Sequence, residues 1–309
     1  MKKNLYKEVN SKDFSKFLQT KLPRKLIEEI KNYKLNYKNI SERKNESLIN
    51  EIVNILLEKK FIFAGYKYKP LWEKGWGENF LNLKKNFSKQ ALVPGYSDKF
   101  RYGRIGSKLI ETCTKNFAQK ILHLTLLFGY EKFLKKYNHI VDFGCGTGHA
   151  ILYLNKFDNK KNFFGLDWSK SSQKIFRILN KKFSNIKGSN FDFFNPKINF
   201  NLEKNNWAAY TTHSMEQIGN KYKKFYNFLK KKKPGVVVNI EPIPEILNSS
   251  SLLDNLSIYY MKKRKYLNGY LNFLSKEEKK KKIKIIFKRK SYFGSFLIYE
   301  HSIIIWKFC

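Results

Sequence analysis

The chain has 309 residues, 42% hydrophobic and 17% aromatic, so it can bury a core for about two domains and is not disordered as a whole. Its formal charge of +37 would ordinarily favour a nucleic acid or an anionic membrane as partner. Only seven of the 62 basic residues are Arg, however, which is the residue that phosphate recognition favours. The many Lys, Asn, Ile, Phe and Tyr residues all have AT-rich codons, so we favour codon usage over phosphate recognition as the source of the charge.

Cysteine usage and hydropathy exclude several other classes. Cys113, Cys145 and Cys309 are widely separated and form no metal-ligand spacing, so neither a disulfide framework nor a zinc site is expected. The most apolar stretches, Ile121–Gly129 and Phe296–Trp306, are much shorter than the ~20 residues that a membrane span requires. Because no apolar segment follows the basic start of the chain, we expect a cytoplasmic protein without a metal or a membrane span.

The first 115 residues are predicted to form a helical N-terminal region. Ile49, Ile52 and Leu56 recur at helical spacing, and a weaker stripe of the same kind begins at Leu26. The pattern breaks at residues 61–102, which are aromatic and punctuated by glycine. Such a composition predicts a structured loop.

Residues 116–309 are predicted to alternate between strands and helices. An amphipathic helix over 117–128 comes first, and helices are also expected from about residue 149, after the cap Ser169, and around 218–229. Strands are predicted at residues 139–143, 162–166, 186–190, 207–211 and 236–240. An insertion at 243–282 follows, and two last strands at 283–287 and 302–306 have no long helix between them. This order predicts an α/β fold with a Rossmann-like, doubly wound, mostly parallel seven-stranded sheet that ends in an antiparallel hairpin.

The most informative motif is the glycine turn from Val141 to Gly148, directly after a strand and before a helix. A phosphate-binding P-loop is excluded, because Gly148 is followed by His149 and Ala150 where that loop requires Lys and Ser or Thr. The dinucleotide fingerprint would place its third glycine at position 149, so dinucleotide binding is disfavoured.

The run Asp-x-Gly-x-Gly-x-Gly, starting at Asp142, closely resembles the first motif of the class I S-adenosylmethionine-dependent methyltransferases. The resemblance extends over residues 116–309 and implies that S-adenosyl-L-methionine is the cofactor. Backbone N–H groups of the loop would suit its carboxylate, and the acidic residue before the first glycine would suit its ammonium group. Asp167 lies 23 residues beyond Gly144, close to the spacing of a carboxylate that binds ribose hydroxyls. Trp168 would pack on the adenine and Asp192 would read its amino group. The implied cofactor-binding residues are Asp142, Gly144, Cys145, Gly146, Gly148, Asp167, Trp168 and Asp192.

The end of the fourth parallel strand is where this family places the methyl acceptor. Residues 210–218 contain no Asn/Asp-Pro-Pro-Tyr/Phe motif, which disfavours methylation of nucleic acid amines by the known route. His213 is a candidate general base, because its ordinary pKa near ~6.5 suits that role, and Glu216 is a second catalytic candidate. His213 could instead cap a helix or contact the cofactor. Glu216 could instead interact favourably with the dipole of the helix that it begins.

The aromatic stretch before the core is the predicted cover of the acceptor. Trp72, Trp76 and Tyr96 offer apolar area with a polar tip, and Arg101 would suit an acidic group on the acceptor. We expect residues 71–104 to fold over the carboxyl edge of the sheet near His213. The insertion at 243–282 would add a second wall.

Three functions remain open at this point. The first is O-methylation of a small molecule or of a sugar or natural product, which the fourth-strand segment and the aromatic stretch favour. The second is RNA methylation, which the charge suggests but the even spread of Lys disfavours. The third is a binding module that keeps the methyltransferase fold without catalysis.

Overall fold

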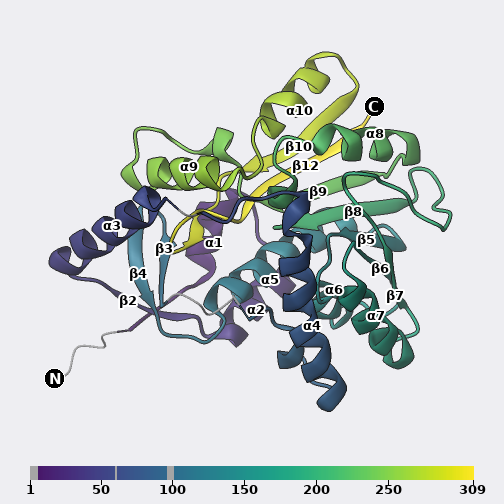
Figure 1. Ribbon diagram of the computed structural model, residues 1–309, viewed down its shortest axis with the longest axis horizontal. Helices are drawn as coiled ribbons and strands as arrows, with labels where there is room; N and C mark the ends of the chain where they lie inside the picture. Colours follow the sequence, from purple (N-terminus) through teal and green to yellow (C-terminus); the bar gives the residue numbers. More distant parts are fainter. Residues whose placement is uncertain (1–5, 60, 96–100) are drawn as a thin grey trace.

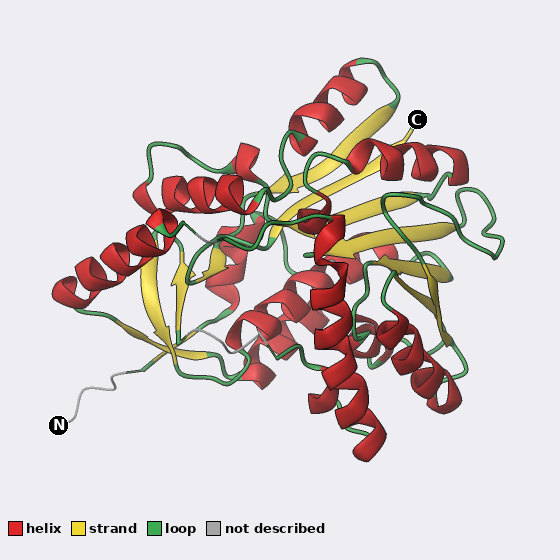
Figure 2. Ribbon diagram, viewed as in Figure 1, coloured by secondary structure: helices red, strands yellow, loops and turns green. Residues whose placement is uncertain are grey.

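The computed structural model describes residues 6–59, 61–95 and 101–309, and Figure 1 shows their arrangement. Within these ranges the strands form one seven-stranded sheet and one five-stranded sheet, with helices packed around them (Figure 2). None of the helices formed by these residues is both long and apolar enough to cross a membrane.

The seven-stranded sheet has the order β10-β12-β9-β8-β5-β6-β7. Its strands are β5 (His139–Phe143), β6 (Asn162–Asp167), β7 (Ile186–Asn190), β8 (Trp207–Thr212), β9 (Val236–Glu241), β10 (Ile283–Arg289) and β12 (Ser302–Phe308). The pairs among β5, β6, β7, β8 and β9 are parallel, whereas β12 runs antiparallel to both β9 and β10. The predicted fold class is therefore confirmed, including the terminal hairpin at one edge.

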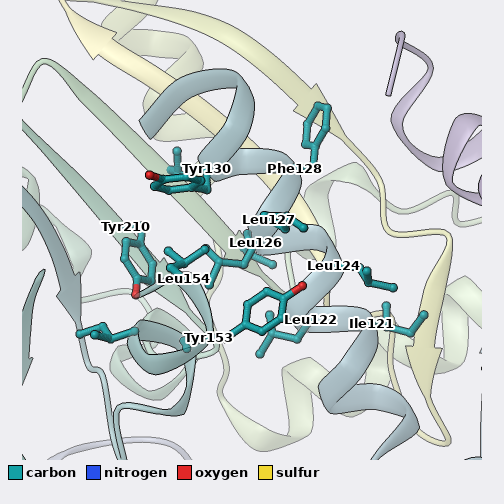
Figure 3. Close-up of a cluster of buried hydrophobic side chains, with 14 of the residues drawn as sticks. Ile121, Leu122, Leu124, Leu126, Leu127, Phe128, Tyr130, Tyr153, Leu154 and Tyr210 are labelled. Atoms are coloured by element: carbon teal, nitrogen blue, oxygen red, sulfur yellow. The ribbon is translucent and has the colours of Figure 1, made fainter. Parts of the chain in front are cut away.

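Both faces of this sheet are buried, because its strands are short apolar runs whose side chains alternate between two cores. Ile140 and Val238 pack in the core that is covered by α5 (Phe117–Gly129), α6 (His149–Asn155) and α7 (Lys170–Lys182). Figure 3 shows Leu126 of α5 on the same side as Leu154 of α6 and Tyr210 of β8, whereas Leu124 lies on the other side of the helix. On the other face, Val237 packs under α8 (Tyr222–Lys232) and α10 (Tyr270–Lys279).

The five-stranded sheet was not predicted. Its antiparallel strands are β1 (Lys7–Glu8), β2 (Asn36–Asn39), β4 (Lys108–Thr112), β3 (Tyr102–Ile105) and β11 (Phe293–Ser295), in that spatial order. The region 1–115 does contain α1 (Ser11–Leu18), α2 (Arg24–Tyr33) and α3 (Glu42–Leu57), but its description as helical is incomplete. The strands escaped prediction because they have two to five residues, and their pairing is set by distant segments such as β11.

The prediction of a loop over 61–102 is wrong for its central part, which forms the helix α4 (Lys69–Lys85). Pro70 lies in the first helical turn, where the missing N–H of proline costs nothing. Gly75 and Gly77 inside the helix misled the sequence analysis, because glycine lowers helix propensity without preventing a packed helix. In the predicted insertion, α9 (Leu252–Arg264) precedes α10.

Candidate functional site

A pocket of about 700 Å³, part of it open to solvent, lies at the carboxyl ends of β5, β6 and β8. This is the position where a parallel sheet of this topology leaves a ligand crevice. Its lining residues come from the segments that follow β5, β6, β7 and β8, from the start of α6 and from α4: Trp72, Trp76, Gly144, Cys145, Gly146, Thr147, His149, Asp167, Trp168, Phe191, Phe193, Thr212, His213, Ser214, Gln217 and Ile218.

The glycine turn after β5 forms the floor of the pocket. Gly144 and Gly146 have φ of 80° and 53°, in the left-handed region that glycine adopts at no steric cost. A Cβ atom added to Gly146 would lie 2.9 Å from Cζ2 of Trp76, so the indole packs directly against the turn. Gly148 does not line the pocket, since its open side is filled by Phe176 of α7.

Asp167, at the end of β6, joins the glycine turn to the start of α7. Its Oδ2 accepts a 3.0 Å hydrogen bond from the Gly146 N–H, and its Oδ1 accepts a 2.8 Å bond from the Ser169 N–H. Burial raises the pKa of Asp167 to about 6, although both hydrogen bonds oppose that shift. The carboxylate lines the pocket and can accept further hydrogen bonds there.

Aromatic side chains line the pocket next to Asp167. Trp168 lines the pocket and stacks on Phe194 with ring centroids 6.0 Å apart. Asp192 does not line the pocket, and its Oδ1 accepts a 2.8 Å hydrogen bond from the Phe194 N–H. Phe191 and Phe193, on either side of Asp192, do line the pocket and were missed, because only acidic residues were sought in this stretch.

The structure places Asp142 beneath the glycine turn and not among the lining residues. The carboxyl group is fully buried next to Tyr210. Burial raises the pKa of Asp142 well above its usual range, which favours the neutral acid.

Helix α4 is tied to the core by Glu73. Its carboxylate accepts hydrogen bonds from the N–H groups of Lys170 and Ser171 and from the hydroxyls of Ser169 and Ser171, at 2.6 to 2.9 Å. Burial acts to raise the pKa of Glu73, but the bonds from Ser171 and Ser169 outweigh it and hold the pKa below its usual value. Glu73 thus caps the N-terminus of α7 from another helix.

We expect Glu73→Ala to lower the free energy of unfolding by ~1–2 kcal/mol, because the first turn of α7 loses its capping carboxylate. Chemical denaturation measures the effect. Glu78→Ala is the matched control, since Glu78 is an exposed residue of the same helix. Equal effects of the two substitutions would contradict the capping role.

The predicted lid residues separate into two groups. Trp72 and Trp76 lie in the same pocket as His213, with their ring centroids 5.5 Å apart. Arg101 is not brought to the pocket, because it pairs with Glu111 on the five-stranded sheet. Tyr96 lies outside the described residues.

His213 follows β8 and has φ of 50°, which a non-glycine residue adopts only when its surroundings hold it there. The buried carboxylate of Glu241, at the end of β9, accepts the N–H groups of Ser214, Met215 and Glu216 at 3.1 to 3.3 Å. Glu241 therefore fixes the turn that carries His213. Sequence reasoning missed this role, although a carboxylate ending a strand next to β8 was a usable signal.

Two histidine pairs border the pocket, and they contain four of the five histidines of the chain. His213 Nε2 lies 3.1 Å from His301 Nδ1, and His149 Nδ1 lies 3.1 Å from His123 Nε2. Burial lowers the pKa of His213 to about 4 and that of His149 to about 3. Both pocket histidines are therefore neutral at pH 7, and each is a weaker base than an exposed imidazole.

Glu216, the second catalytic candidate, is buried beside the pocket and is not one of the lining residues. Its Oε1 accepts a 2.7 Å hydrogen bond from Gln217. Burial, together with the nearby charges of Glu241 and Glu300, raises the pKa of Glu216 to about 8, against the opposing effect of Arg264.

We expect Glu216→Gln to have little effect on stability at pH 5 and to stabilise the chain by ~1–3 kcal/mol at pH 9. The folded pKa lies above the unfolded value, so the wild type loses stability progressively as the pH rises from the unfolded pKa near ~4.3 to the folded pKa of about 8, and the amide removes this loss. Urea unfolding at both pH values measures the difference. Glu46→Gln, at an exposed position of α3, is the control. A stabilisation independent of pH would refute the explanation.

No protein-family model matches the chain, and no curated protein matches it either. Solved structures with a similar fold include the O-methyltransferase NcsB1 from neocarzinostatin biosynthesis, crystallised with S-adenosyl-L-homocysteine and 1,4-dihydroxy-2-naphthoic acid (14% identity, TM-score 0.41). Others are the pyocyanin biosynthetic protein PhzM (12%, 0.46) and the dimethyltransferase RosA from Streptomyces davawensis (9%, 0.44). The alignments cover 62%, 63% and 63% of this chain and 58%, 56% and 57% of those chains.

The strand order with the glycine turn after β5 is the arrangement that the sequence resemblance predicted. The chain has the class I methyltransferase fold. The likenesses to solved structures are too distant to carry a function to it, so the function has to be argued from the pocket.

Proposed function

We propose that the chain is an S-adenosylmethionine-dependent methyltransferase that methylates an oxygen atom of a small molecule, such as a sugar or a natural product. The observation that carries the proposal is the pocket itself, which joins the glycine turn, Asp167 and Trp168 to His213 under the indoles of α4. The first group of residues suits a nucleoside cofactor, and the second suits a small acceptor.

The residues present fit the cofactor. Gly144 and Gly146 leave a backbone cradle that a Cβ atom would fill, since an added Cβ at Gly144 would collide with Ser214 and one at Gly146 would meet Trp76. Asp167 would accept the ribose hydroxyls, and Trp168 would pack against the adenine. When bound, S-adenosylmethionine supplies an activated methyl group on a positively charged sulfur.

The chain's own residues would align the acceptor and take its proton. With the methyl donor held beside Asp167 and Trp168, the acceptor hydroxyl would lie near His213, and its proton would pass to the imidazole of His213. Burial keeps that imidazole neutral, and Glu241 and His301 hold it in place. Trp72 and Trp76 would exclude water from the acceptor.

Calorimetric titration of the full chain with S-adenosylhomocysteine and S-adenosylmethionine tests the proposal. We expect one site per chain, with a dissociation constant in the micromolar range for both ligands. Incubation with methyl-labelled S-adenosylmethionine and a panel of hydroxylated small molecules then tests transfer. Absence of binding of either cofactor form would refute the proposal.

A further inference from the structure

The described residues that line the pocket carry almost no charge, although the chain is strongly basic. Since 62 of the 309 residues are Lys or Arg, sixteen residues taken at random would include about three basic ones. Among the described residues, none of the sixteen that line the pocket is Lys or Arg. Asp167 is the single acidic residue in this lining, and it belongs to the proposed cofactor half.

A second crevice on the same molecule shows the contrast. It lies beside the first and shares Ile218 with it, and it encloses about 1060 Å³, part of it open to solvent. Lys221, Lys262 and Lys265 line it, which is the share of basic residues that the composition predicts. The first pocket therefore departs from the composition, whereas the neighbouring crevice follows it.

The nearest polar groups would not compensate a negative charge either. His149 and His213 are neutral at pH 7 because burial lowers the pKa of each. Lys69 lies over the ring of Trp168, 5.5 Å from its centroid, and is not one of the lining residues. None of the described lining residues would supply a cation to a carboxylate or phosphate bound under α4, so such a group would lose hydration without a compensating contact from the protein.

Flat apolar surfaces face the same space. The indoles of Trp72 and Trp76 lie 5.5 Å apart between centroids, and Phe191 and Phe193, which also line the pocket, contact each other edge to face at 5.3 Å. Such rings favour stacking with a planar ligand. The neutral imidazoles of His149 and His213 add no positive charge that would favour an anion.

We propose that the acceptor is an uncharged planar compound that bears a hydroxyl group, and that the pocket discriminates against anionic acceptors, including nucleic acid phosphates. This inference rests on the proposed function and narrows its substrate class. It sets aside the expectation that Arg101 binds an acidic group on the acceptor, because Arg101 directly precedes β3 and pairs with Glu111 of β4.

Three naphthalene probes of one ring size test the proposal: 2-naphthol, which is uncharged at pH 7, 2-naphthoate and 2-naphthyl phosphate. Each is titrated calorimetrically into the full chain saturated with S-adenosylhomocysteine, and again into the chain alone. We expect 2-naphthol to bind at least tenfold more tightly than either anion. A smaller preference, a preference for an anion, or no binding of any probe would overturn the inference.

A variant tests the physical cause. Gln217→Lys is combined with Glu216→Gln, so that the new ammonium group has no carboxylate partner at position 216, and this Lys variant is expected to shift the preference at least tenfold toward 2-naphthyl phosphate. Gln217→Met in the same Glu216→Gln background adds no charge and should keep the preference for 2-naphthol. An unchanged preference in the Lys variant would show that charge is not the cause. Failure of the proposed function is distinguishable, because it appears as absent binding of S-adenosylhomocysteine in the preceding titration, whatever the probes do.

Discussion

Replacing Gly146 by valine is expected to abolish measurable binding of S-adenosylhomocysteine while the chain remains folded. The valine side chain would point into the pocket, where its Cβ atom alone would lie 2.9 Å from the indole of Trp76. It would also have to adopt φ near 53°, which costs roughly 1–3 kcal/mol for a residue with a side chain. A loss of this size lowers stability without unfolding a chain of ordinary stability.

The control for this variant is Gly75→Val. Gly75 lies in α4 one residue before Trp76, and an added Cβ there meets no atom within 4 Å. Circular dichroism and thermal denaturation establish that both variants are folded, and calorimetry then measures their affinity. Wild-type affinity in the Gly146 variant would mean that the cofactor does not approach the glycine turn, and the site would have to be sought elsewhere.

The parallel core could be predicted almost residue by residue because its information is local. The strands at residues 139–143 and 186–190 have the predicted bounds, and Ser169 caps α7 as expected through a hydrogen bond from the Ser172 N–H. Apolar runs separated by turns and caps are sufficient to define such elements. The glycine turn was informative for the same reason, since glycine is the residue that a left-handed turn selects.

The cover of the pocket could be predicted only in part. Trp72 and Trp76 were correctly placed near His213, but the helix that carries them was predicted as a loop, because packing outweighs the low helix propensity of its glycines. The five-stranded sheet depends on pairing between β3 and β11, nearly 200 residues apart in the sequence. No local pattern encodes such a contact.

The supporting residues of the site illustrate the same limit. Glu73 has no distinguishing sequence context, and Glu241 is marked only by its position at the end of a strand. The role of each depends on the backbone N–H groups that the fold brings to it. The pairing of His213 with His301 joins segments 88 residues apart. The histidines nevertheless offered a simple signal. The chain has only five of them, so each one could be considered as a possible site residue together with the others.

Replacing Asp167 by asparagine is expected to weaken S-adenosylhomocysteine binding by ~100-fold, because two hydrogen bonds from ribose hydroxyls to a charged acceptor contribute roughly 1.5 kcal/mol each. The wild type should also lose affinity as the pH falls below about 6, where Asp167 takes up a proton and can no longer accept both hydroxyls. The amide does not titrate, so the variant should lose this pH dependence.

Asp192→Asn is the matched comparison, because Asp192 accepts the Phe194 N–H outside the pocket lining, and we expect its affinity to stay within threefold of the wild type. Calorimetry at pH 5, 6 and 7.5 on the wild type and both variants separates the two carboxylates. Asp167 holds the N–H groups of Gly146 and Ser169, so a general distortion of the pocket could also weaken binding, but a distortion would not remove the dependence on pH. Retention of that dependence in Asp167→Asn would assign the titrating group to another residue and exclude Asp167 as the ribose acceptor.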